Sequence, residues 1–177
     1  MQIGAGSAPA RSIMQSETVL DDFVQSHIGH VGLCDLLEEI ADKLPNQVDP
    51  GLYDAAMEML KRDLALHRRD LEEGLFPLLL KRARPEDNIE ASLEQLRVEH
   101  LTDDGGALEL LEMLPLLAAG DPMADPNVCG YMLRNFFECY RRHLSWELNL
   151  IVPLARKRLG LCDLEKLEAL MRHHRQN

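Results

Sequence analysis

Five side chains that can bind a metal lie near the middle of four predicted helices. His143 and Glu147 occur four residues apart in the segment HLSWELNLIVP. Residues at this spacing lie one turn apart on the same face of an α-helix, so both side chains can point at one object. His30, His67 and His100 interrupt apolar patterns in the other three segments. Neutral imidazole together with carboxylate favours iron, manganese or zinc over calcium or magnesium.

Proline and glycine clusters divide the chain into the helices that must position these side chains. The clusters fall at residues 45–51, 83–85 and 120–126 and at Gly160. They leave four long predicted helices and a short fifth, near residues 17–44, 52–82, 86–118, 127–158 and 162–174. No segment has the alternation of β-branched residues that is typical of a strand. Because short connections favour antiparallel neighbours, the predicted fold is all-α, an antiparallel up-down-up-down four-helix bundle with a short C-terminal helix.

Apolar residues recur every three or four positions along each long helix, and this spacing marks the face toward the bundle axis. The second pattern runs Met57, Leu60, Leu64, His67, Leu71, Gly74 and Leu78, and the fourth runs Leu133, Phe136, Tyr140, His143, Glu147, Leu150 and Leu154. Because an α-helix rises about 1.5 Å per residue, histidines near four helix midpoints lie at one height. A core histidine can be satisfied by hydrogen bonds, but an unpaired polar group costs about 1–3 kcal/mol. A metal bound by all four offsets that cost.

Composition limits the class of protein. The chain has 177 residues, of which 46% are hydrophobic and 5% aromatic, which predicts a single domain at residues 16–177 after a flexible N-terminal tail at residues 1–15. A net charge of −11 excludes nucleic acid and an anionic membrane surface as partners. No apolar stretch approaches the ~18 residues of a membrane span. Four cysteines without CxxC spacing and the lack of a signal-peptide pattern favour the cytoplasm.

The motifs resemble those of the hemerythrin-like (HHE cation-binding) domains over roughly residues 20–158. Members of that family carry a histidine on the first helix, HxxxE on the second, a histidine on the third, and HxxxE or HxxxxD on the fourth. The corresponding segments here are SHIGHVGLCDLLEEI, HRRDLEEGLFP, LRVEHLTDDGG and HLSWELNLIVP. The resemblance implies a non-haem iron site of one or two ions in the bundle core, with manganese or zinc as alternatives. The predicted ligands are His30, His67, His100, His143 and Glu147.

The second motif departs from the family pattern, because Leu71 stands where the family has a glutamate that usually bridges two metals. Asp70 and Glu72 lie about 100° to either side of it, so neither replaces it without a distortion such as a π-bulge. Without such a distortion, Asp70 and Glu72 belong to a solvated acidic face of the helix. Asp103 shares the inward face with His100, either as a ligand or as an acceptor behind a ligating imidazole. Both roles stay open.

Further histidines and glycines lie near the motifs. His27, one turn before His30, is a ligand, a donor to a ligand or a polar lid, and we rank it below His30 because His30 has the better register. His173 and His174 lie in a charged C-terminal segment, where we expect them to be exposed and outside the site. The nearby glycines either leave room beside the metal or allow close helix packing: Gly29, Gly32, Gly74, Gly105 and Gly106.

Two classes of function follow from the resemblance. One is a protein that binds or senses dioxygen, nitric oxide or a related small ligand at a di-iron or degenerate mono-iron centre. The other is an iron-handling or redox enzyme, acting in iron-centre repair or in nitric oxide or peroxide reduction. We prefer binding because no GxSxG, Cys/His pair or phosphate-cradling loop occurs, and enzymatic activity stays open. A third reading is a degenerate bundle that the loss of the glutamate has left without metal. Whether the protein forms a homodimer also stays open.

Overall fold

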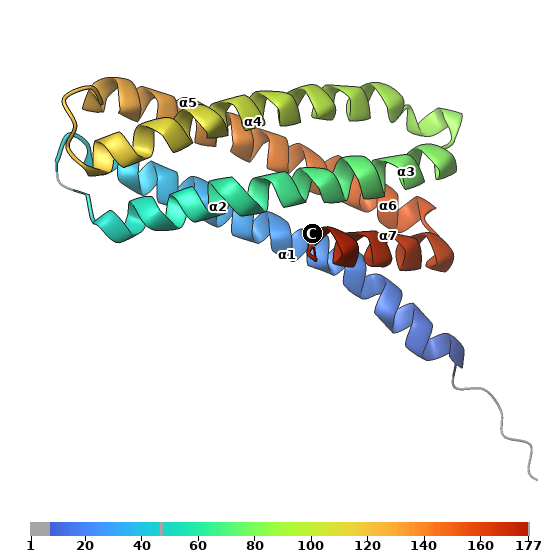
Figure 1. Cartoon of the computed structure of the whole chain (residues 1–177). Coiled ribbons are helices and arrows are strands. Elements are labelled where there is room, and N and C mark those ends of the chain that lie inside the picture. Colours follow the sequence, from blue (N-terminus) through green and yellow to red (C-terminus); the bar gives the residue numbers. More distant parts are fainter. Residues whose placement is uncertain (1–7, 47, 177) are drawn as a thin grey trace, which may run out of the picture.

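A computed structural model describes the backbone of residues 8–46 and 48–176, and the side chains of these ranges from residue 19 onward. Four helical rods lie side by side, and a shorter helix folds back against them (Figure 1). The elements are α1 (Ala8–Lys43), α2 (Pro50–Arg69), η1 (Asp70–Leu75), α3 (Phe76–Arg82), η2 (Pro85–Asp87), α4 (Glu90–Ala118), α5 (Pro126–Trp146), η3 (Glu147–Ile151), α6 (Val152–Arg158) and α7 (Leu161–His174). No strand occurs in the part of the chain that the structure describes.

The rods form a closed ring of neighbours. α1 contacts α2 and α5, and α4 contacts the same two helices. The second rod joins α2, η1 and α3, and the fourth joins α5, η3 and α6, where η1 and η3 are π-helical turns. α7 packs on α1 and η1. The predicted all-α antiparallel bundle with a C-terminal helix is therefore confirmed.

Local sequence explains where the rods begin. Asp49 and Asp125 precede the prolines that open α2 and α5, and their side chains accept hydrogen bonds from the backbone N–H of Gly51 at 2.9 Å and of Asn127 at 2.8 Å. Such N-caps satisfy otherwise unpaired amides, and proline fits the first helical turn. α1 starts at Ala8, earlier than the predicted residue 17, while residues 1–7 of the predicted tail lie outside the described residues.

A polar layer divides the hydrophobic core in two. One apolar cluster fills the end of the bundle near the α1–α2 and α4–α5 connections and includes Leu37, Leu60, Leu110 and Leu133. A second fills the opposite end and includes Phe23, Leu75, Leu93 and Ile151. In each rod the buried histidines fall between the two clusters, so the expected common depth of these residues is present. None of the described helices has the length and apolar content needed to cross a membrane.

The two π-helical turns shift the inward face of their rods by one residue. Each turn of π-helix holds one residue more than a turn of α-helix. The residues predicted to face inward within or beyond these turns are therefore only half-buried, namely Leu78, Leu150 and Leu154. Their neighbours occupy the core instead, namely Leu75, Leu79, Ile151 and Ala155.

Candidate metal centre

The Glu147 carboxylate lies among four imidazole rings, one from each rod. Its Oε2 is 2.9 Å from Nε2 of His27 and 3.0 Å from Nε2 of His67. Its Oε1 is 3.2 Å from Nε2 of His100 and 3.0 Å from Nε2 of His143. All five side chains are buried. The carboxylate thus joins two groups, each of two histidines and one carboxylate oxygen, that could hold a metal ion.

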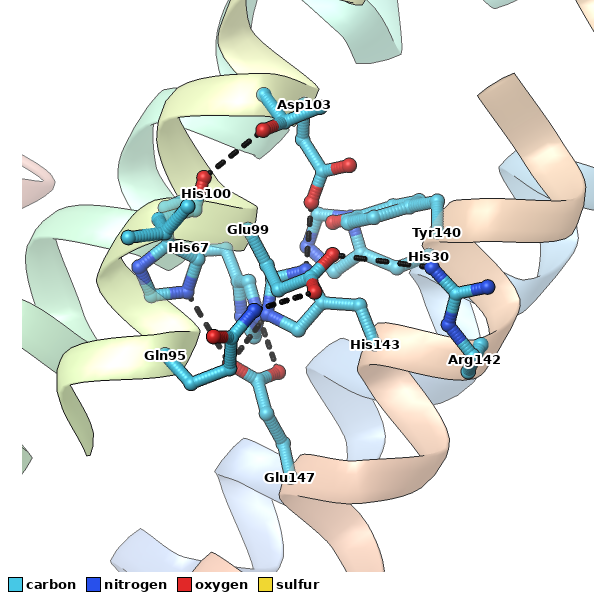
Figure 2. A network of polar contacts seen from close by, with 12 residues as sticks. His30, His67, Gln95, Glu99, His100, Asp103, Tyr140, Arg142, His143 and Glu147 are labelled. Carbon is cyan, nitrogen blue, oxygen red and sulfur yellow. Dashed lines mark hydrogen bonds and ion pairs between the residues drawn. The ribbon is translucent and has the colours of Figure 1, made fainter. Parts of the chain in front are cut away.

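In three of the rings the outer nitrogen, Nδ1, contacts an oxygen atom. Nδ1 of His27 is 2.7 Å from the carbonyl oxygen of Phe23, and Nδ1 of His100 is 2.6 Å from Oε1 of Glu72. Nδ1 of His143 is 2.5 Å from Oδ2 of Asp103 (Figure 2). A backbone carbonyl can only accept, and a carboxylate usually does, so these contacts place the proton of a neutral ring on Nδ1.

This arrangement of protons calls for a cation between the rings and Glu147. With Nδ1 protonated, each neutral ring of His27, His100 and His143 would point the lone pair of Nε2 at a carboxylate oxygen. Three buried imidazolium ions would avoid that repulsion, at a large desolvation cost. A metal ion avoids it with neutral rings, because it accepts a lone pair from each nitrogen and each oxygen. Donor atoms that bind one metal at about 2.1 Å and at right angles lie about 3 Å apart. The four separations between Nε2 and a carboxylate oxygen, 2.9–3.2 Å, match that value, and all donor atoms of each group lie within 4.8 Å of one another.

The pKa values of His143 and Glu147 both depart from their ordinary values because each side chain lies among charged and hydrogen-bonding partners. In the protein without metal, burial lowers the pKa of His143, but its hydrogen bonds to Asp103 and Glu147 outweigh burial and raise that pKa to about 10, so a metal would displace a proton from this ring. In the same metal-free state, burial raises the pKa of Glu147, but the charge of His67 and the hydrogen bonds from the other rings in their protonated form outweigh it and hold the pKa well below its usual range. Glu147 is therefore an anion ready to bind a cation.

The sequence matches the hemerythrin HHE cation-binding domain over residues 18–155. The chain belongs to the hemerythrin HHE cation-binding domain family. No curated protein shows significant sequence similarity to it. Membership of this family indicates cation binding, typically of iron, and the two buried His/Glu groups of this HHE domain could hold a metal ion.

Four of the five predicted ligands of the HHE domain meet at its centre, and His30 lies beside them. The ring centroid of His30 is 4.6 Å from that of His67, and its Nδ1 is 3.0 Å from the hydroxyl of Tyr140. Burial, followed by the charge of His67, lowers the pKa of His30 to about 3. His27, which the sequence ranks lower, is the α1 residue in contact with Glu147.

A signal for His27 is present in the sequence. Residues at equal distances from the middle of a tight connection lie opposite each other in an antiparallel helix pair. The α1–α2 connection spans residues 44–49, and its middle is at 46.5. The position on α1 that is as far from this middle as His67 is residue 26. His27 is closer to that position than His30. Register within α1 alone did not contain this information, because both histidines face the bundle axis.

The acidic candidates act at a distance from the centre. Glu72 contacts Nδ1 of His100 and Asp103 contacts Nδ1 of His143. Asp103 therefore lies behind an imidazole of the centre, where it accepts a hydrogen bond. Asp70 faces α7, where its Oδ1 is 2.7 Å from Nδ1 of His174. The prediction that His174 is exposed is therefore wrong: it is 5% exposed because α7 folds back onto η1. His173 is exposed, as expected.

Of the five glycines near the motifs, two allow close packing, and the other three, Gly29, Gly32 and Gly105, face open space. A Cβ on Gly74 would lie 2.9 Å from Cδ1 of Leu167, and a Cβ on Gly106 would lie 3.0 Å from the ring of Phe136.

Leu71, one turn after His67, is 1% exposed and belongs to the second apolar cluster. The residue that replaces the family glutamate is thus part of the hydrophobic core.

Proposed function

We propose that this HHE domain holds two iron ions and uses them to bind or sense dioxygen, nitric oxide or a related small ligand. One ion would lie at His27, His67 and Glu147, and the other at His100, His143 and Glu147. The observation that carries the proposal is the position of the Glu147 carboxylate, each oxygen of which faces a pair of Nε2 atoms. We refer to these as the His27/His67 position and the His100/His143 position.

The donor set favours iron and an exchangeable ligand. Each position offers two histidines and one carboxylate, the combination found in non-haem iron(II) proteins that react with oxygen. Three protein donors leave coordination sites open, which a small molecule can occupy. The apolar clusters on either side of the layer exclude bulk water, and this strengthens the electrostatic interactions of the centre.

The two positions differ in the groups behind their ligands. Carboxylates contact both outer nitrogens of the His100/His143 position and increase the basicity of those rings. In the His27/His67 position, Nδ1 of His27 contacts a backbone carbonyl, and Nδ1 of His67 has no hydrogen-bond partner among the residues that the structure describes. With Leu71 in place of a second bridging carboxylate, only one negative charge is shared by two cations. We therefore expect the His100/His143 position to fill first and the other to bind more weakly.

The test is the metal content of protein purified without a His-tag. Mass spectrometry should find iron that approaches two ions per chain as free iron rises, with two distinct affinities. Optical spectra recorded with dioxygen, nitric oxide and neither gas should show a reversible change, whereas an enzyme would consume the gas. Glu147→Gln should abolish both positions, while the matched exposed substitution on α5, Glu138→Gln, should leave both intact. Wild-type protein without metal, or full metal content in Glu147→Gln, would refute the proposal.

A further inference from the structure

A pocket of about 180 Å³ lies between α1 and α2, next to the candidate metal centre. Gly29 and Arg175 line it and are exposed, whereas His30, His67 and Asp70 line it and are buried. The pocket therefore extends from the molecular surface to a ring that contacts Glu147.

His67 provides an independent sign that the pocket holds a ligand or solvent. The side chain is 4% exposed, and its Nδ1 is the one buried side-chain polar atom without a hydrogen-bond partner among the described residues. Buried polar atoms are nearly always paired, so an unpaired one calls for an occupant. Since Nε2 of the same ring is 3.0 Å from Glu147, the imidazole lies between the pocket and the centre.

The size of the pocket limits what it can admit. Pockets for drug-sized ligands enclose roughly 300–1,000 Å³, so this one suits molecules of a few atoms. A second pocket of about 190 Å³ lies between α4 and α5, but it reaches Asp103, which is behind His143. The α1–α2 pocket is lined by His67, which contacts Glu147 directly. The α4–α5 pocket reaches Asp103, which contacts the centre only through His143.

We propose that small ligands reach the metal centre through the α1–α2 pocket and arrive first at the His27/His67 position. This inference rests on the proposed function. Gly29 is the exposed α1 residue that lines this pocket, and a Cβ there meets no atom within 4 Å, so a long side chain at this position has room to lie across the entrance. The same backbone position tolerates substitution, since glycine is the weakest helix former apart from proline.

The test compares Gly29→Leu with a matched control on the same helix. Gly32 is also exposed, has no atom within 4 Å of a Cβ, and does not line the pocket, so Gly32→Leu makes the same chemical change away from the entrance. Azide is mixed rapidly with the iron(III) form of each protein, and its association is followed optically. Gly29→Leu should lower the association rate about tenfold or more, because entry limits binding. Gly32→Leu should bind at the wild-type rate, and all three proteins should hold equal iron.

Failure of this inference can be told from failure of the proposed function. Equal iron content and equal azide rates in the two variants would overturn the entrance and leave the metal centre intact. If wild-type protein holds no iron, the proposed function fails. The route to His67 is then judged in metal-free protein by diethylpyrocarbonate labelling and mass spectrometry. Gly29→Leu should protect His67 from modification relative to Gly32→Leu, and equal labelling would overturn the route.

Discussion

Replacing Asp103 with asparagine tests how much the carboxylate behind His143 contributes to metal binding. Asp103 Oδ2 is 2.5 Å from Nδ1 of His143, and both side chains are buried. Asparagine keeps the size of the side chain and removes its negative charge. Carboxylates behind ligating imidazoles typically contribute 10–100-fold in affinity, or about 1.4–2.7 kcal/mol. Asp103→Asn should weaken the His100/His143 position by about that factor and change the His27/His67 position less.

The adjacent aspartate provides the control. Asp104 pairs with Arg68 at 2.6 Å and makes no hydrogen bond to a histidine of the centre among the described residues, so Asp104→Asn removes the same charge and should change both affinities much less than Asp103→Asn. Iron(II) is titrated in competition with a coloured chelator, and bound iron is counted by mass spectrometry. In metal-free protein, NMR titration should also show the pKa of His143 falling from about 10 in Asp103→Asn. Equal affinities in wild type and both variants would refute the role given to Asp103.

Three further predictions concern the missing bridge, α7 and pH. Leu71→Glu should raise the iron-to-protein ratio at limiting iron above that of Leu71→Gln, and equal ratios would show that a carboxylate there does not reach the metal. His174→Ala should lower the free energy of unfolding in urea by about 1–3 kcal/mol, because buried Asp70 loses its 2.7 Å hydrogen bond to His174 and keeps only the 3.3 Å contact with Arg175. Its iron content should exceed that of His143→Ala, and equal losses would place His174 in the centre. In metal-free protein the raised pKa of His143 contributes stability that is complete below the unfolded value of 6.5 and is lost as pH rises toward about 10. The free energy of unfolding should therefore decline over that range, and no decline would contradict the charged state of His143.

The helices and the depth of the polar layer could be predicted from sequence because both depend on local patterns. Proline and glycine mark the ends of the rods, and the three-to-four spacing marks their inward faces. The choice between His27 and His30 could not be made in this way. Both face the axis and differ by three residues, or about 4.5 Å of rise, so only the pairing of α1 with α2 separates them. The burial of His174 was equally hidden, since it depends on α7 folding back onto η1.

The π-helical turn η1 explains how the centre compensates for Leu71. In a continuous α-helix, residue 72 would lie about 140° around the axis from His67, pointing away from the neighbouring rod. The π-helical turn holds an extra residue and rotates Glu72 toward α4, where it meets Nδ1 of His100. The sequence alone indicated only that an acidic neighbour of Leu71 would need a π-bulge to reach the centre. Because the rotation brings Glu72 to the outer nitrogen and not to Nε2, its negative charge would act on a metal in the proposed centre through the imidazole of His100. In that centre Glu72 would strengthen a ligand from behind and would not take the place of the family glutamate between two cations.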